Sequence, residues 1–486
     1  MTEQRVLFVC GSPRRARSAS RVTAEYLARF LDFDHEWLDV AGLKLTADPS
    51  EADAGFTHAL QRLQAADAVV FVFGAWSLFT PIELQRLFEK LLVHPEHRLQ
   101  GKLAAAVMTS VRVADDATLE RVRLVSEGLG LAYLGDVSAN GNPFFGYTDE
   151  EQTEQSCRQL AGQLNRALAD GFRPARRTAR LEPRALSPLW RGEALPIAGP
   201  EVAKTGTRPI VIVSGHRLAD SPAAASVAEG VRRWSKNPVE VVEVAAHEVR
   251  PCTGCYQCIF QAEGRCTQRD DYEAIATRLS QAAGVVLVGV CSASTVDAPL
   301  KALLDRSFSV AHRPTWQGKQ ALSVAVGGDT LEPETALLLQ RAAQTRGAHG
   351  VAALAPSCDA PERFVAALRR AVEDLDRALD EGWNDAERFT TRSVRKLFRD
   401  LAAQNGMILR ADYRYYRERG GFPKVSDGGA QVLLRLLFRS RRLEKLMLEA
   451  QQRSTAARCE KRLQSLLAQG VRPGTGQRIA EPGPAI

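Results

Sequence analysis

Long apolar runs are missing from this chain of 486 residues. No stretch approaches the roughly 20 residues that a helix needs to cross a bilayer, so we expect no transmembrane segment. The opening MTEQRVLFVC has no charged leading region and only a short apolar run, which argues against a signal peptide. We therefore expect a cytoplasmic protein, in a reducing compartment where disulfides are rare.

Two common nucleotide-binding signatures are absent as well. The sequence contains neither a Walker A loop nor a G-x-G-x-x-G fingerprint, which disfavours ATP and Rossmann-type dinucleotides as ligands. The order of the residues also indicates no Ser/His/Asp or Cys/His catalytic arrangement. A protein whose bound cofactor supplies the electron chemistry requires none of these arrangements.

The chain does contain two copies of one α/β unit, called repeat one and repeat two below. Repeat one opens with RVLFVCGSPRRARSAS and repeat two with RPIVIVSGHRLADSPA, so that Ser12 aligns with Ser214. Further along, Leu84 aligns with Leu300 and Gly101 with Gly318, at a larger offset. Repeat two therefore carries an insertion between its first and third strands that repeat one lacks.

Each repeat alternates short apolar runs with amphipathic helices. Continuous Val, Ile, Leu and Phe runs fit parallel strands that are covered on both faces. Five such strands with intervening helices predict a doubly wound sheet, which binds its ligands at the carboxyl ends of the strands. We expect strands near residues 5–10, 35–40, 68–74, 102–110 and 131–138, and near 209–214, 238–244, 284–290, 319–326 and 350–355.

These patterns divide the chain into four parts. Repeat one covers residues 1–171, an Arg-, Pro- and Ala-rich linker covers 172–206, repeat two covers 207–385, and a helical extension covers 386–486 and ends in a segment with a disordered composition.

The extension is basic and the rest of the chain is acidic. Residues 388–486 hold 21 Lys and Arg against 8 Asp and Glu, a net charge of +13. Leucine-bearing helices are expected at 390–404 and 430–452, and such helices bury their apolar faces. We predict that they pack on the acidic body or on a second subunit, which gives a homo-oligomer, and that they bind no specific nucleic acid.

The insertion of repeat two carries four cysteines in the run PCTGCYQCIFQAEGRC. Cys252, Cys255, Cys258 and Cys266 have the spacing C-x2-C-x2-C-x7-C. This spacing lets three thiolates converge while the fourth closes the site. Four thiolates hold a 4Fe–4S cluster, and they also hold structural zinc, while a site without metal is the third alternative. The other cysteines are expected to pack in cores, although Cys291 is also a candidate redox thiol.

A polar loop follows the first strand in each repeat and precedes a helix, and this combination can bind a phosphate group. In repeat one the candidate phosphate ligands are Ser12, Arg14, Ser18 and Ser20. In repeat two they are Ser214, Arg217 and Ser221. The second set is the weaker one, because Asp220 would repel a phosphate.

Other loops at the same ends of the strands could contact a planar ring. Trp76 follows the third strand of repeat one and could stack on the ring, with simple core packing as the alternative. Thr109 follows the fourth strand of repeat one, and Gly327 and Gly328 follow the fourth strand of repeat two. The two glycines would allow close approach of the backbone to a planar ligand.

These motifs resemble the NAD(P)H-dependent FMN reductases and, more closely, their iron–sulfur flavoprotein branch. The resemblance rests on GSPR with the serines that follow it, on PCTGCYQCIFQAEGRCTQRDD and on DAPLKALLDRS, and it covers about residues 3–170 and 207–380. It implies two tandem flavodoxin-like domains, bound FMN, and a 4Fe–4S cluster beside the flavin. The signatures are divided between the repeats, so the chain could have one flavin site, two, or a composite one.

The implied function is FMN-dependent oxidoreduction or electron transfer between NAD(P)H or a protein donor, FMN, a 4Fe–4S cluster and an acceptor. One alternative is an NAD(P)H-dependent FMN or quinone reductase without a cluster. The other is a non-catalytic binding or assembly module derived from a flavodoxin. The expected partner is a small-molecule or protein redox partner.

Overall fold

The computed structural model describes most of the chain. The described residues are 4–75, 80–93, 99–110, 115–142, 146–147, 150–174, 194–255, 257–260, 265–292, 295–327, 332–355, 361–384, 389–406 and 409–422.

Repeat one contains five parallel strands in the order β2-β1-β3-β4-β5, the order of a flavodoxin-like doubly wound sheet. A short strand, β6, adds to β5 in the antiparallel direction. The strand bounds are β1 Arg5–Cys10, β2 Asp34–Asp39, β3 Ala68–Gly74, β4 Leu103–Ser110, β5 Ala132–Asn142 and β6 Gly146–Tyr147. The predicted positions are confirmed, except that β5 runs further than expected.

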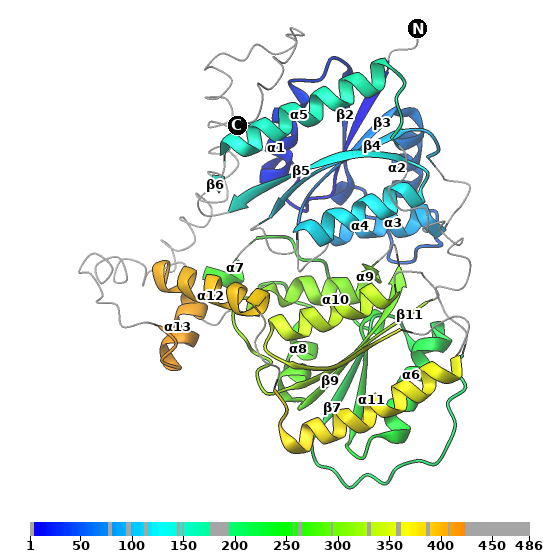
Figure 1. Ribbon diagram of the computed structural model, residues 1–486, viewed down its shortest axis with the longest axis vertical. Coiled ribbons are helices and arrows are strands. Elements are labelled where there is room, and N and C mark those ends of the chain that lie inside the picture. Colours follow the sequence, from blue (N-terminus) through cyan, green and yellow to red (C-terminus); the bar gives the residue numbers. More distant parts are fainter. Residues whose placement is uncertain are drawn as a thin grey trace, which may run out of the picture.

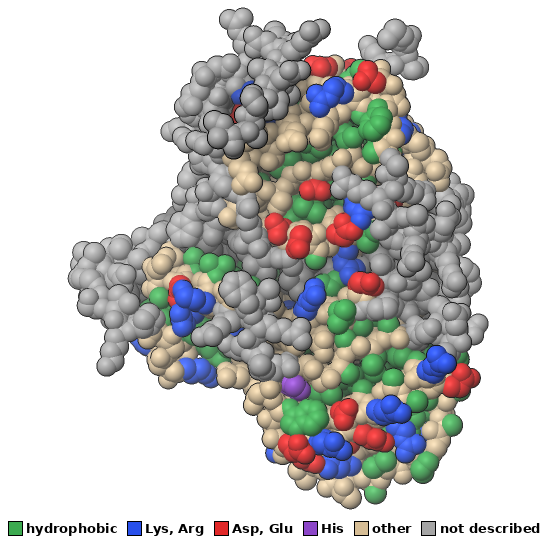
Figure 2. Space-filling view, in the orientation of Figure 1, with side chains coloured by type: hydrophobic (Ala, Val, Ile, Leu, Met, Phe, Trp, Pro, Cys, Tyr) green, Lys and Arg blue, Asp and Glu red, His purple; other side chains and the backbone are tan. Residues whose placement is uncertain are grey.

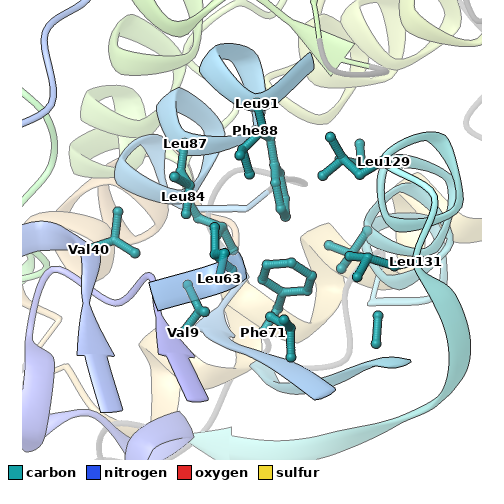
Figure 3. Packing of buried hydrophobic residues seen from close by; sticks show 14 of the residues in the cluster. Val9, Val40, Leu63, Phe71, Leu84, Leu87, Phe88, Leu91, Leu129 and Leu131 are labelled. Carbon is teal, nitrogen blue, oxygen red and sulfur yellow. The ribbon is translucent and has the colours of Figure 1, made fainter. Parts of the chain in front are cut away.

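Helices cover both faces of this sheet. Residues of α1 and α5 pack on one face, and residues of α2, α3 and α4 pack on the other (Figure 3). Figure 3 shows the second of these cores, in which Phe71 of β3 lies edge-on to Phe88 of α3. The bounds are α1 Ala19–Ala28, α2 Ala54–Ala65, α3 Ile82–Val93, α4 Asp115–Gly128 and α5 Glu150–Ala169, with short 3-10 helices η1 Arg15–Arg17 and η2 Val40–Gly42.

Repeat two has the same topology, with parallel strands in the order β12-β11-β9-β7-β8 and a short strand, β10, antiparallel to β9. Its strands are β7 Ile210–Ser214, β8 Val239–Glu243, β9 Gly284–Ser292, β10 Thr295–Val296, β11 Gln320–Val326 and β12 His349–Leu354. The aligned glycines confirm the duplication, because Gly101 and Gly318 both have positive φ (75° and 83°) just before the fourth strand. The predicted fold class is therefore confirmed.

The helices of repeat two are arranged like those of repeat one. Residues of α6 and α11 pack on one face of the sheet, and residues of α8, α9 and α10 on the other. The insertion lies between β8 and α8 and contains the short helix α7. The bounds are α6 Pro222–Trp234, α7 Gln257–Phe260, α8 Tyr272–Gln281, α9 Ala298–Arg306, α10 Glu332–Thr345 and α11 Pro361–Glu381, with 3-10 helices η5 Leu218–Asp220, η6 Val244–Ala246 and η7 Ser307–Val310.

The extension adds two described helices, α12 Phe389–Gln404 and α13 Arg410–Glu418. Helix α12 agrees with the helix predicted at 390–404. The helix predicted at 430–452 and the end of the chain lie outside the described residues. No helix in the described ranges is both long enough and apolar enough to cross a bilayer. On the face drawn in Figure 2, acidic and basic side chains of repeat two are interspersed.

The two repeats pack against each other through equivalent helices, α3 and α9 (Figure 1). Ile82 of α3 lies against Ala298 and Ala302 of α9, where the small alanine side chains permit close approach. The Gln85 side-chain amide donates to the Val296 carbonyl, 3.4 Å away. Because the same helix of each repeat forms the contact, the arrangement resembles the two-fold interface of a homodimer.

Acidic and basic side chains are buried along this interface. Lys301 and Asp305 form an ion pair within α9, and both side chains are almost completely buried. From the other repeat, Glu83 interacts with both of them. Its Oε2 atom is buried without a hydrogen-bond partner among the described residues. Burial, with a smaller contribution from Asp305, raises the pKa of Glu83 to about 7.

We predict that Glu83→Gln stabilises the protein above neutral pH. A carboxyl group whose pKa is higher in the folded state makes stability fall as pH rises from its ordinary value of 4.5 to about 7. The glutamine variant should therefore match the wild type near pH 4.5 and exceed it by up to about 3 kcal/mol at pH 8. Thermal unfolding across this range measures the difference.

The exposed Glu201 supplies a control, because Glu201→Gln should leave the pH profile of the thermal midpoint unchanged. Identical pH profiles for the wild type and Glu83→Gln would show that folding does not raise the pKa of the Glu83 carboxyl group.

Candidate functional site

The cysteine-bearing insertion folds as a loop between η6 and α8. Gly254 adopts a positive φ of 62°, a conformation that favours glycine, and so lets the chain turn back between Cys252 and Cys255. The Gly254 backbone N–H acts to lower the pKa of the nearby Cys252 thiol, against the larger effect of burial. Helix α7 then carries Cys258, and Cys266 follows on the return arm of the loop.

All four cysteines line one small cavity. Cys258 is buried, and Cys252, Cys255 and Cys266 are half-buried. The remaining lining comes from the loop itself, from the end of α9 and from η7, namely Thr253, Gly254, Thr267, Gln268, Arg306, Phe308 and Ser309. None of the seven described cysteines of the chain forms a disulfide. The four cysteines thus share one cavity, and their predicted role as metal ligands stays a prediction.

One buried ion pair ties the two arms of the loop together. The Arg306 guanidinium donates to both Asp270 oxygens, at 2.6 and 3.0 Å, and both side chains are fully buried. Arg306 also donates to the Arg250 carbonyl at 2.9 Å, just before Cys252, and interacts with the Cys266 side chain. Asp270 in turn accepts from the Arg250 backbone N–H at 3.0 Å. A bidentate pair of this kind fixes both distance and orientation.

In repeat one, whose corresponding loop has no cysteines, a buried cation holds the loop in the same way. Lys90 occupies the position that aligns with Arg306, and it lies 3.2 Å from Asp53 at the start of α2. Its ammonium also donates to the Asp48 and Glu51 carbonyls, at 2.7 and 2.6 Å. In both repeats a buried cation from the helix after the third strand holds the loop after the second strand.

The electrostatics of the cavity favour a cation among the thiols. Burial raises the pKa of Cys252 to about 12, and Asp305, Cys255 and Cys266 add to the effect. Burial also raises the pKa of Cys258, and the other three thiols of the site act in the same direction. The raised pKa values of Cys252 and Cys258 oppose thiolate formation, and a bound metal would favour it by supplying positive charge.

Four cysteines form the donor set of this cavity. Within the described ranges, no three His, Cys, Asp or Glu side chains lie close enough together to hold a metal ion. Structural zinc and a 4Fe–4S cluster both use four thiolates, so the residue types of the cavity suit either one.

The candidate phosphate loop of repeat one gathers its serines at the start of α1. Ser18 caps the helix by accepting from the Arg21 backbone N–H at 3.2 Å, and the Ser20 hydroxyl donates to Ser18 at 3.3 Å. The Ser12 hydroxyl oxygen accepts from the Arg14 backbone N–H at 3.3 Å. The three serine side chains are buried, whereas Arg14 is half-buried.

The loop of repeat two uses its polar groups internally. The Ser214 hydroxyl donates to the His216 carbonyl at 2.9 Å, and Ser221 caps α6. The Leu218 backbone N–H, in η5, donates to the Glu243 carboxylate at 3.2 Å. Pro222 stands in the first turn of α6 and has no N–H to offer. In repeat one the Ser18 hydroxyl is likewise used within its own loop, where it donates to the Arg15 carbonyl at 2.9 Å.

The loops expected to contact a ring are described only in part. Thr109 lies near the carboxyl end of β4, where its carbonyl accepts from the Ala75 backbone N–H at 2.9 Å. Gly327 follows β11 with a φ of 135°. Trp76 and Gly328 lie outside the described residues. Cys291 is buried in β9 beside Thr335, which agrees with a packing role.

A family model described as NADPH-dependent FMN reductase matches this chain twice, over residues 4–143 and 211–352. The two matches together cover more than half of the chain. The chain belongs to the NADPH-dependent FMN reductase family. It is accordingly a flavin oxidoreductase that binds FMN, built as a tandem pair of family domains.

Curated relatives of this family member include two archaeal proteins. An iron-sulfur flavoprotein from Archaeoglobus fulgidus is 28% identical over 193 residues, which are 37% of this chain and 84% of the relative. An iron-sulfur flavoprotein from Methanocaldococcus jannaschii is 28% identical over 120 residues, which are 24% of this chain and 61% of the relative.

Solved structures similar to part of this chain include an FMN-dependent NADH-azoreductase from Bacillus anthracis in complex with FMN. It is 14% identical, with a TM-score of 0.28, over 33% of this chain and 99% of that one. An NAD(P)H:quinone oxidoreductase from Methanothermobacter marburgensis is 15% identical, with a TM-score of 0.29, over 34% of this chain and 100% of that one.

Sequence reasoning missed the residue that organises the cysteine loop. Arg306 was visible within the run LKALLDR, but only as part of a family signature. Its partner Asp270 is 36 positions away, and no local pattern links the two. The alignment of Lys90 with Arg306 was the available signal, since a cation recurs at the same position of both repeats.

We predict that Asp270→Asn destabilises the protein and weakens its cysteine site. The change leaves the buried Arg306 guanidinium without a carboxylate, and breaking such a pair costs about 3–5 kcal/mol. Urea unfolding should show a loss of about 3 kcal/mol, and the reaction of Cys252 and Cys266 with a thiol reagent should become faster as the loop loosens. The control is Glu248→Gln, because the Glu248 side chain is 70% exposed and its pair with Arg250 contributes at most about 1 kcal/mol. Equal stability of the two variants would refute the anchoring role.

Proposed function

We propose that this flavin oxidoreductase holds FMN in repeat one and a 4Fe–4S cluster in the cysteine loop of repeat two, as one redox unit. The observation that carries the proposal is the single cavity lined by Cys252, Cys255, Cys258 and Cys266. The curated relatives, which are named iron-sulfur flavoproteins, support the same conclusion.

The hydrogen bonds of the two phosphate loops favour repeat one as the flavin site. Within the described residues, no acceptor takes the Ser12 hydroxyl hydrogen, whereas the Ser214 hydroxyl donates to its own loop. The helix start in repeat one carries arginines, and in repeat two it carries a proline and a carboxylate-bound N–H. An FMN phosphate requires donors and positive charge, which repeat one supplies.

Contacts between the repeats support placing the two cofactors in one unit. Val249, shortly before Cys252, packs against the cluster of Ile82, Ala298 and Ala302 at the interface. The buried pair Lys301 and Asp305 interacts with Cys252 and also with Glu83 of repeat one. The cysteine loop of repeat two therefore lies near the start of α3 in repeat one.

The roles of the residues follow from these contacts. Ser12, Arg14, Ser18 and Ser20 would hold the flavin phosphate, and the four cysteines would ligate the cluster. Arg306 and Asp270 would fix the loop that carries the ligands, and Lys301 would place positive charge beside Cys252. When bound, FMN exchanges electrons singly or in pairs and the cluster exchanges them singly, so the protein can connect NAD(P)H or a protein donor to a one-electron acceptor.

Cofactor content tests the proposal directly. Anaerobically purified wild-type protein should contain about four iron atoms per chain and one FMN. Cys255→Ser should lose most of the iron and keep the flavin, while Cys291→Ala, a change at a core cysteine of the same repeat, should keep both. Flavin with less than about one iron atom per chain in the wild type would instead favour an NAD(P)H-dependent FMN or quinone reductase without a cluster.

The assignment of FMN to repeat one has a matched test. Arg14→Glu places a like charge beside the phosphate and should weaken FMN binding by at least about 10-fold, equal to about 1.4 kcal/mol. Arg217→Glu makes the same change in repeat two and should leave binding unchanged. Fluorescence titration of the flavin-free proteins measures both affinities. The opposite pattern would move the flavin to repeat two.

A further inference from the structure

The described part of the extension lies over the cysteine loop (Figure 1). Helix α13 contacts α7, the short helix that carries Cys258. The buried side chains of Cys258, Ala402, Leu409 and Tyr416 form one apolar cluster, with Phe308 and Leu401 packed against it. Cys258 is only 9% exposed as a result. Residues 389–406 and 409–422 are called the cap below.

Buried polar bonds hold the cap in place. Asp412 of α13 lies 2.9 Å from the His312 Nδ1 atom and 3.0 Å from the Arg313 Nε atom. The Tyr416 hydroxyl donates to the His312 carbonyl at 2.7 Å. From α12, Phe398 stacks on the His312 ring with the ring centres 4.3 Å apart. The segment just after α9 and η7 is therefore the docking point of the cap.

The cap is an addition to the family domains. The family matches end at residue 352, before the cap begins. The cap also has a specific partner in the fold, because its apolar residues meet a cysteine of the loop and its acidic residue meets a histidine and an arginine of repeat two. A segment that served only as a linker to the rest of the chain would not require the contacts with Cys258, His312 and Arg313.

We propose that the cap covers Cys258 and shields this cysteine from solvent and from reagents that attack thiols. This shielding does not depend on which metal the site holds, so it can be tested on metal-free protein.

Alkylation of the full-length, metal-free, reduced protein tests the proposal. Iodoacetamide forms a sulfur–carbon bond with a thiolate as iodide leaves, at a rate that depends on the thiolate fraction and on access to the sulfur. The quantity compared is therefore the rate constant of the thiolate itself, obtained from the pH dependence of the rate, so that a changed pKa does not count as a change in access. Mass spectrometry of peptides gives the rate for each cysteine. In the wild type, Cys258 should react more slowly than Cys255. Asp412→Asn and Tyr416→Ala should each speed the reaction of Cys258 by at least about 10-fold relative to Cys157, a core cysteine of repeat one.

Two exposed positions of α13 supply matched controls. Glu418→Gln removes a carboxylate and Arg414→Ala truncates a long side chain, and both should leave the ratio of Cys258 to Cys157 unchanged. General unfolding would expose Cys258 and Cys157 alike, so the ratio of their rates would move toward one. A rise in this ratio therefore reports a local change at Cys258. An unaltered ratio in Asp412→Asn and Tyr416→Ala, or an equal rise in the controls, overturns the proposal. Loss of FMN or iron in other experiments would not affect this result.

Discussion

A buried cation that reaches from one helix into one loop is the constraint on which the site depends. In repeat two, Arg306 holds both arms of the cysteine loop through Asp270 and the Arg250 carbonyl. In repeat one, Lys90 holds the shorter loop through Asp53 and backbone carbonyls. Lysine suffices for a compact loop, whereas the planar guanidinium can join two separated arms at once. The insertion could thus be accommodated without disturbing the sheet behind it.

The two repeats differ in the loops that carry the proposed roles. In repeat one, arginines stand in the loop after the first strand, whereas in repeat two a proline and a carboxylate-bound N–H occupy the equivalent region. The four-cysteine run occurs only in repeat two. The proposed division of roles rests on these differences.

The fold was largely predictable from the sequence, because buried strands appear as continuous apolar runs and the repeat offset locates the insertion. The convergence of the four cysteines followed from their short spacing. The Arg306 anchor and the docking of Tyr416 on His312 were not predictable, since each joins residues far apart in the chain. An amphipathic pattern shows that α12 buries one face, but not which surface covers it. The predicted roles of Trp76 and Gly328, and the predicted domain bounds, stay predictions.

The contact between α3 and α9 has a consequence for how the shared region is assembled. In a homodimer such a contact forms between two molecules and weakens on dilution. Here both halves belong to one chain, so the contact is intramolecular and its formation is governed by an effective concentration that dilution does not change. The covalent link also fixes the ratio of repeat one to repeat two at one to one. Within one chain, each repeat can pair only with the other repeat and not with a copy of itself. Even at very low protein concentration, each molecule would therefore form the contact between α3 and α9.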